Sequence, residues 1–308
     1  MRKIILLLIV ALLNSISSYG EINVQQRIAE ANKGNASAQA TLVRYYYGNK
    51  EYKSCKEWAM TLTNNTGTNK DHKITANLYL GLMYANGQGV DKSRQTAIIY
   101  LKNGVDLESA DCADILSQIY EIDSENKDLT KAFEWLKKSA ELGDYQNAYS
   151  IADHYENGLG KFKKSNLGFP EPINYQAAIK FYELYIENLP FYKPNPEHEY
   201  QRRRRHDPEV EYKIANAYFY GENGVAQNYE KAIKYYNMFI DGNGNTNSYM
   251  ERGATMSDQK SGDALWNLST CYRFGRGVVK NELTARKLIR KAAEKGNEKA
   301  INFLNKEN

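Results

Sequence analysis

The stretch that decides the fold is ANLYLGLMYANGQGVDKSRQTAIIYLKNG, residues 76–104, because its pattern returns as ALWNLSTCYRFGRGVVKNELTARKLIRKA at residues 264–292. The two stretches align without a gap. The positions they share hold, in the first copy, Ala76, Leu80, Tyr84, Gly87, Gly89, Val90 and Ala97. A motif that recurs with its spacing intact is the signature of a repeat architecture. The chain is therefore expected to be an array of stacked units rather than one closed globular domain.

Each unit is expected to form two short antiparallel helices joined by a turn. Ala76, Leu80 and Tyr84 are spaced four residues apart, which places them on one face of a first helix. The Gly-Gln-Gly sequence that follows ends this helix, because glycine favours backbone conformations that a helix interior does not use. Ser93 then provides an N-cap for a second helix. Neither helix can bury its apolar face alone, so successive pairs must stack.

The same positions can be followed through six units. The leucine position of the first helix holds Leu42, Leu80, Leu116, Ile151, Ile214 and Leu268. The tyrosine position holds Tyr46, Tyr84, Tyr120, Tyr155, Tyr218 and Tyr272. The small position of the second helix holds Cys55, Ala97, Ala132, Ala178, Ala232 and Ala285, so Cys55 is interpreted as an alanine substitute. The N-cap position holds Glu51, Ser93, Asp128, Asn174, Asn228 and Asn281, of which all but Glu51 are good capping residues. A ring that recurs at one position is expected to pack between helices rather than to bind a ligand.

Two insertions interrupt a spacing that is otherwise about 36 residues. The first, residues 161–208, contains all 6 prolines of the chain. Proline cannot continue a helix interior, so the chain is expected to leave the stack between the two helices of the fourth unit and again after the second. The second insertion, residues 241–262, is rich in glycine, asparagine and serine and is expected to be a mobile loop. Short helices at residues 22–32 and at the C-terminal end are expected to cap the array.

Residues 1–20 are expected to be a secretory signal peptide. Arg2 and Lys3 precede an apolar run from Ile4 to Leu13, and small residues precede a cleavage point after Gly20. This run is too short to cross a bilayer, and no later segment is apolar enough to do so, so no membrane insertion is expected. The mature chain, residues 21–308, is then expected to be periplasmic or secreted. With 41 basic and 37 acidic residues, the net charge of +4 argues against nucleic acid as a partner.

The sequence predicts no metal, no cofactor and no catalytic residue. The 3 cysteines, Cys55, Cys112 and Cys271, lack metal-binding spacing and are expected to be buried thiols, although a bridge between Cys55 and Cys112 remains open in an oxidising compartment. The 4 histidines are scattered and are expected to lie at the surface. The Gly-x-Gly loops resemble phosphate cradles, but no strand precedes them and they recur with the repeat, so they are interpreted as hairpin turns.

An enzymatic alternative, a cell-wall hydrolase or penicillin-binding enzyme, rests on two short matches. Ser124 and Ser257 each stand three residues before a lysine, as in the SxxK motif. The accompanying S-D-N and K-T-G elements are absent, and both matches lie in predicted loops. The interpretation as a chance match is favoured.

The first insertion contains the best functional lead, a run of four arginines with tyrosines nearby. Tyrosine and arginine are the residues most enriched among interface anchors. The candidate partner-binding residues are Tyr192, Tyr200, Arg202, Arg203, Arg204 and Arg205. Surrounding carboxylates argue against nucleic acid, which leaves a solvated segment or a partner-binding lip as the two interpretations.

The motif A-x3-L-G-x2-Y-x2-G-x-G-V-x6-A at Ala76–Ala97 resembles the Sel1-like repeat family, whose members are relatives of tetratricopeptide solenoids. The resemblance extends over nearly the whole mature chain, although the third unit lacks the glycines. It implies an all-α, right-handed α-solenoid that binds other proteins, commonly in bacterial envelopes or in settings linked to secretion and virulence. Some cysteine-rich members have been linked to penicillin binding, but this chain lacks their cysteine pattern.

These observations together predict an all-α, right-handed α-solenoid of about six stacked helix-turn-helix repeats with two irregular insertions. The predicted function is a non-enzymatic interaction module that binds a protein or peptide on the solenoid face and the insertion loops. A narrower alternative, implied by the resemblance to the family, is an immunity protein that neutralises a periplasmic toxin. The sequence does not indicate an oligomeric state.

Overall fold

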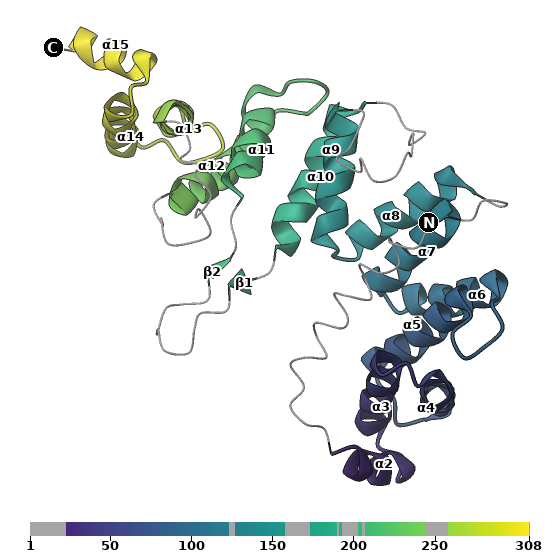
Figure 1. Ribbon diagram of the computed structural model, residues 1–308. Helices are drawn as coiled ribbons and strands as arrows, with labels where there is room; N and C mark the ends of the chain where they lie inside the picture. Colours follow the sequence, from purple (N-terminus) through teal and green to yellow (C-terminus); the bar gives the residue numbers. More distant parts are fainter. Residues whose placement is uncertain are drawn as a thin grey trace. The chain divides into compact units, whose positions relative to one another are not determined.

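The structure, a computed structural model, describes residues 23–122, 127–157, 173–189, 191–192, 203–204, 207–243 and 258–307. The chain divides into two compact units, Met1–Leu142 and Gly143–Asn308. Over the described ranges it forms 14 helices and one pair of two-residue strands (Figure 1). The all-α solenoid class predicted from the repeat is confirmed.

The first unit is built from three helix pairs and one preceding helix. Its helices are α2 (Val24–Asn32), α3 (Ala36–Gly48), α4 (Tyr52–Asn64), α5 (Lys70–Asn86), α6 (Arg94–Asp106), α7 (Ala110–Ile122) and α8 (Leu129–Glu141). Within each pair the two helices pack closely, and α5 also contacts both α3 and α7. The first helices of consecutive pairs therefore lie next to one another along one side of this unit. Helix α2 packs on α3 and covers the end of the stack, as predicted.

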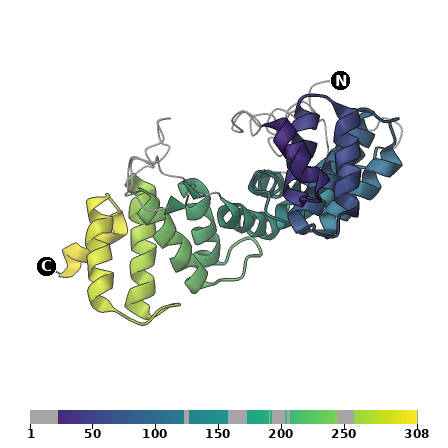
Figure 2. The ribbon, with the colours of Figure 1, turned by 90° about the horizontal axis from the view of Figure 1, so that it is seen from below.

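The second unit repeats this arrangement. Its helices are α9 (Tyr145–Asn157), α10 (Tyr175–Asn188), α11 (Pro208–Tyr220), α12 (Tyr229–Asn243), α13 (Asp258–Phe274), α14 (Glu282–Glu294) and α15 (Glu298–Glu307). Figure 2 shows helices of this unit, coloured green to yellow, side by side. The strands β1 (Phe191–Tyr192) and β2 (Arg203–Arg204) lie in the chain between α10 and α11. Ala300 of α15 is fully buried against the last pair, so this helix closes the C-terminal end.

Burial confirms the register of all six helix pairs. The six aliphatic side chains at the leucine position are at most 2% exposed, and the six small residues of the second helix are at most 1% exposed. Cys55 is among the latter, fully buried, and its Sγ lies 3.4 Å from the carbonyl oxygen of Val43. The alanine-like role predicted for it is confirmed.

In the pairs α5–α6 and α9–α10, the repeated tyrosine packs between the two helices, as predicted. The ring of Tyr84 on α5 stacks on that of Tyr100 on α6, with centroids 5.7 Å apart. The ring of Tyr155 on α9 stacks in the same way on Phe181 of α10, at 5.8 Å. Each stack joins the last turn of the first helix to the second helix of the same pair.

Helix starts are specified by side-chain caps. The side chains of Ser93, Asp128, Asn174, Asn228 and Asn281 each accept a hydrogen bond from the backbone N–H three residues later. Glu51, the one poor capping residue in the series, makes no such bond. Each cap satisfies a backbone donor that would otherwise lack an intrahelical partner.

The Gly-x-Gly loops are hairpin turns that also fit one repeat against the previous one. Gly89 has φ +66°, and a Cβ placed on it would lie 2.6 Å from the Cβ of Tyr52, the first residue of α4. Gly277 also has φ +66°, and its Cβ would lie 2.6 Å from the backbone nitrogen of Glu230 on α12. Both glycines therefore provide a positive φ and space for a neighbouring helix start. This geometry is that of the hairpin turns expected from the sequence.

The predicted insertions are partly helical. Helix α10 lies within 161–208, and α11 begins with Pro208 at a first-turn position, where proline is tolerated. Helix α12 runs to Asn243 and α13 starts at Asp258, so both ends of 241–262 are helical. The rest of the second insertion lies outside the described residues, as does the proposed signal peptide.

Candidate functional site

The predicted partner-binding residues are brought together in part by a short antiparallel ladder. In the pairing of β1 with β2, Phe191 lies opposite Arg204 and Tyr192 opposite Arg203 (Figure 1). Tyr200, Arg202 and Arg205 lie outside the described residues. The sequence placed the tyrosines and the arginines in one insertion, and the structure adds a backbone register between them.

Both ends of the segment 190–206, which contains this ladder, are fixed on helices. Leu189, which follows α10, is only 6% exposed. On the other side, the Asp207 carboxylate caps α11 by accepting from the Val210 N–H at 3.3 Å, and it also accepts a 2.9 Å hydrogen bond from the Tyr185 hydroxyl of α10. Burial, together with the Asp207 charge, raises the pKa of Tyr185, which keeps it as the hydrogen-bond donor. The segment therefore leaves the solenoid from a fixed base.

A carboxylate on α10 links this helix to the next pair. The Glu183 side chain accepts from the Tyr218 hydroxyl of α11 at 2.8 Å, and from the Lys231 ammonium and the Tyr235 hydroxyl of α12 at 2.9 and 3.3 Å. Burial is the main cause that raises the pKa of Tyr218 and of Tyr235. With three donors on one carboxylate, the arrangement is a structural link rather than a general base.

A second link of this kind lies one step earlier. Glu156 of α9 accepts from the Tyr182 hydroxyl of α10 at 2.8 Å and from the Lys213 ammonium of α11 at 2.5 Å. The same ammonium lies 4.7 Å from the centre of the Tyr182 ring. The two links join α9, α10, α11 and α12 in sequence around the helices that carry the segment 190–206. The sequence carries no local signal for them, because each lysine comes from a helix pair that follows its glutamate in the chain.

Only some of the residues considered for catalysis or metal binding lie in the part of the chain that the structure describes. Ser124 and Ser257 lie outside the described residues, and Lys260 of the second SxxK match is ion-paired with Glu209 at 2.5 Å. Within the described ranges, no cluster of three or more histidine, cysteine or acidic side chains could hold a metal ion. None of the helices that the structure describes combines the length and apolar character needed to cross a bilayer.

One of the histidine predictions is wrong. His154 on α9 is only 3% exposed, and its ring lies 6.0 Å from that of the adjacent Tyr155. His72 is consistent with its predicted place, and it forms part of a capping box with Asn69 at the start of α5. His198 and His206 lie outside the described residues.

All three cysteines are fully buried and free, so the bridge left open between Cys55 and Cys112 is not formed in this structure. Burial raises the pKa of the Cys55 and Cys112 thiols to about 12 and that of Cys271 to about 11. Since the thiolate is the reactive form, the native protein at pH 8 should not react with an aromatic disulfide reagent, whereas all three thiols should react in guanidinium chloride. The absorbance of the aromatic thiol that the reagent releases measures the number of cysteines that have reacted. Rapid release from native protein, or fewer than three reactive thiols in the unfolded chain, would contradict the assignment.

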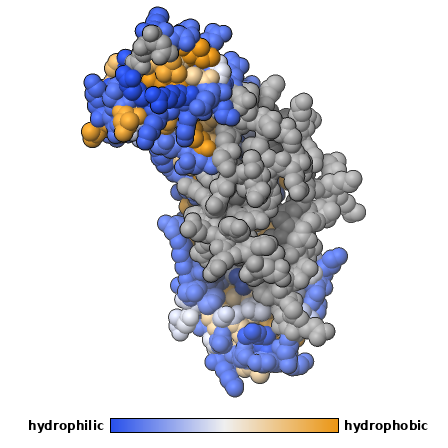
Figure 3. Space-filling model, turned by 90° about the vertical axis from the view of Figure 1, so that its left-hand side faces the viewer, coloured by the Kyte–Doolittle hydropathy of each residue, from blue (hydrophilic) through white to orange (hydrophobic). Residues whose placement is uncertain are grey.

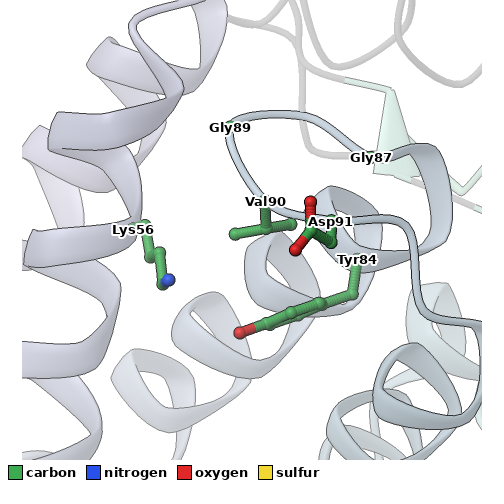
Figure 4. A pocket seen from close by; sticks show the side chains of 6 residues that line it. All are labelled: Lys56, Tyr84, Gly87, Gly89, Val90 and Asp91. Atoms are coloured by element: carbon green, nitrogen blue, oxygen red, sulfur yellow. The ribbon is translucent and has the colours of Figure 1, made fainter.

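An open hollow of about 610 Å³ lies in the first unit, next to the turn that follows α5. It is lined by Lys56, Tyr84, Gly87, Gly89, Val90 and Asp91 (Figure 4). The ring of Tyr84 is already stacked on Tyr100, and the glycines form the hairpin turn. The hollow is therefore a consequence of repeat geometry.

The sequence model of the Sel1 repeat matches residues 74–108, 119–144, 146–184, 208–243 and 262–297. These matches start after the first helix pair, α3 and α4. This pair is assigned as a repeat by its register and by the burial of its core positions. No curated protein matches the chain in sequence.

Three solved structures are similar to this chain. A protective antigen of uropathogenic Escherichia coli that displays an SLR fold is 22% identical with a TM-score of 0.41, and the alignment covers 91% of this chain and 50% of the antigen. A Sel1 repeat protein from Oxalobacter formigenes is 20% identical with a TM-score of 0.39, covering 86% of this chain and 88% of that protein. A Sel1 repeat protein from Klebsiella pneumoniae is 13% identical with a TM-score of 0.25, covering 76% and 92%. This chain thus spans half the length of the E. coli antigen.

Because the Sel1 repeat matches occupy more than half of the residues of this chain, the chain belongs to the Sel1 repeat family.

Proposed function

We propose that this protein is a non-enzymatic adaptor of the bacterial envelope or secreted space, and that it binds a protein partner through the segment 190–206 and the adjoining solenoid face. Sel1 repeats are generally protein–protein interaction modules. The observation that supports this particular site is the ladder between β1 and β2, which sets two aromatic residues opposite two arginines. Aromatic residues and arginine are enriched at the centres of protein interfaces.

The fixed base of the segment supports the same proposal. A contact loop costs less conformational entropy on binding when its ends are already ordered. The Tyr185–Asp207 hydrogen bond and the buried Leu189 provide such ends. A non-enzymatic role is supported by Glu156 and Glu183, whose carboxylates are engaged by hydroxyl and ammonium donors from neighbouring helices.

The location is proposed from residues 1–20, whose charged start and apolar run are typical of a secretory signal. A narrower form of the proposal is that the partner is a toxin delivered to the periplasm, which the segment 190–206 would block. The location is tested by measuring the intact mass of the protein after purification from an osmotic-shock fraction. A mass matching a chain that starts at Glu21 supports it, and an uncleaved cytoplasmic protein contradicts it.

The binding site is tested by affinity capture from envelope extracts. The tagged chain is compared with a variant in which residues 190–206 are replaced by an equally long glycine–serine segment, which leaves α10 and α11 intact. Any protein that the parent captures should be lost with the variant, while the variant keeps the circular dichroism and melting temperature of the parent. Equal capture by both proteins would show that the segment is not the contact.

A further inference from the structure

A ladder of alternating rings and guanidinium groups crosses the last repeat of the second unit. The guanidinium of Arg276 lies 5.5 Å from the Tyr229 ring and 5.2 Å from the Phe274 ring. The guanidinium of Arg273 lies 5.4 Å from the Phe274 ring and 4.4 Å from the Phe303 ring. The five residues come from the start of α12, the end of α13 with its following turn, and α15. We call them the arginine ladder.

Large apolar side chains are exposed on the ladder and within seven residues of Arg276 in the sequence. Phe274 itself is 58% exposed, Val279 is 86% exposed, and Leu283 at the start of α14 is 67% exposed. In Figure 3, the C-terminal helices at the top of the view carry hydrophobic patches among hydrophilic residues. Exposed apolar side chains that gather in one place, with polar residues around them, mark an interaction surface more often than scattered ones do.

The stretch from Arg273 to Lys291, which carries both arginines of the ladder, is rich in basic residues. Glu282 is the only acidic residue between Arg273 and Lys291, and it is ion-paired with Arg286. The exposed basic side chains in this stretch also include Lys280, Lys287, Arg290 and Lys291. Neither Arg273 nor Arg276 has a carboxylate within ion-pair distance among the residues that the structure describes. A guanidinium that rests its face on a ring keeps the N–H donors of its edge for a carboxylate.

The arrangement favours a protein segment over an anionic membrane. A helix that binds a membrane surface must place its apolar face in the lipid. The apolar face of α14, with Ala285, Ile289 and Ala292, is at most 1% exposed, because it packs in the core. Nucleic acid is disfavoured as well, since phosphate binding does not need exposed apolar side chains among the cations, whereas a protein contact does.

We propose that the arginine ladder and the adjoining Val279 and Leu283 form a second docking surface, which binds an acidic, partly apolar segment of a partner protein. Carboxylates of the segment pair with Arg273 and Arg276, and its apolar side chains cover Phe274, Val279 and Leu283. This surface is distinct from the segment 190–206, so it stands whether or not that segment binds a partner.

The test uses fluorescein-labelled peptides and anisotropy. The probe is a twelve-residue peptide of alternating glutamate and leucine, and the controls are a lysine–leucine peptide and a glutamate–serine peptide of the same length. The parent protein should bind the glutamate–leucine peptide most tightly, and binding should weaken as salt rises. The double change Arg273→Gln and Arg276→Gln should weaken it about tenfold or more, the effect of losing a charge-assisted pair.

Two further variants separate binding from folding. Arg286→Gln changes an exposed arginine of the same repeat that already has Glu282 as partner, and its affinity should stay within about twofold. Leu283→Asp changes a side chain that is mostly solvent-exposed, so the fold should persist while binding falls about tenfold through charge repulsion and lost apolar contact.

The proposal is overturned if the glutamate–leucine peptide does not bind, or if the double variant and Leu283→Asp bind it like the parent. It is also overturned if the parent prefers vesicles of phosphatidylglycerol and phosphatidylcholine, or single-stranded DNA, to the peptide and loses that binding in the double variant. Those results would assign the surface to a lipid or a nucleic acid.

Discussion

Replacing Gly277 by alanine is expected to lower the free energy of unfolding by about 3 kcal/mol, because two costs add at this position. Its φ of +66° is unfavourable for any residue with a Cβ. The new Cβ would also lie 2.7 Å from the carbonyl carbon of Tyr229 and 2.6 Å from the nitrogen of Glu230. These are backbone atoms at the start of α12, so the clash cannot be relieved by a rotamer change. Urea denaturation followed by circular dichroism measures the loss.

Gly224→Ala is the matched control. Gly224 lies in a turn of the same unit and has φ +86°, but a Cβ there would meet nothing within 4 Å. Only the conformational cost of the positive φ applies, so the free energy of unfolding is expected to fall by about 1 kcal/mol. Equal losses for the two variants would mean that the turn after α13 does not lie against α12, which would contradict the packing of one repeat on the previous one.

Replacing Leu80 by alanine is expected to cost about 3 to 5 kcal/mol, since it empties the leucine position of the second repeat. Leu80 is fully buried and belongs to an apolar cluster of the first unit that includes buried residues of neighbouring helices. Helix α5 is buried on nearly all sides between Thr75 and Met83, so the surroundings cannot collapse easily into the cavity. Chemical denaturation of the parent and the variant gives the difference in stability.

The control lies in the same helix pair. Ile99 on α6 is 55% exposed, so Ile99→Ala should change the stability by no more than about 0.5 kcal/mol. Similar denaturation midpoints for Leu80→Ala and Ile99→Ala would mean that the repeat has been aligned in the wrong register.

The features that sequence predicted well are those that each repeat specifies within its own residues. Leu80 and Leu268 take their burial from a helical spacing that needs no knowledge of distant residues. Asn281 caps α14 because its side chain reaches a backbone N–H three residues away. Local rules of this kind repeat in every pair, so the number of pairs and their register follow from the sequence.

Features that depend on packing between repeats were not predictable in this way. His154 is buried although scattered histidines are usually at the surface, and the spacing of the four histidines in the sequence gives no sign of this burial. The start of α13 was interpreted as loop on account of its glycine and serine. There, a Cβ on Gly262 would lie only 3.2 Å from the Cβ of Asn297, so close packing near the start of α15 favours a small residue within a helix.

The candidate site also combines features that the sequence predicted with features that only the structure shows. Sequence composition indicated that Tyr192 and the arginine run belong to one functional insertion, but only the backbone pairing gives the register in which Tyr192 is the strand partner of Arg203. The arginine ladder was not anticipated at all. Its rings and guanidinium groups come from three helices and one turn, and no spacing in the sequence relates Tyr229 and Phe303 to Arg273 and Arg276.

Hydrogen–deuterium exchange of the chain, free and bound to its captured protein partner, tests the central proposal most directly. Amides of the segment 190–206 should exchange more slowly in the complex, while peptides from α4 and α6, which belong to the first unit, should exchange at unchanged rates. Protection restricted to other parts of the chain, with 190–206 exchanging equally fast in both states, would contradict the assignment of this segment as the partner-binding site.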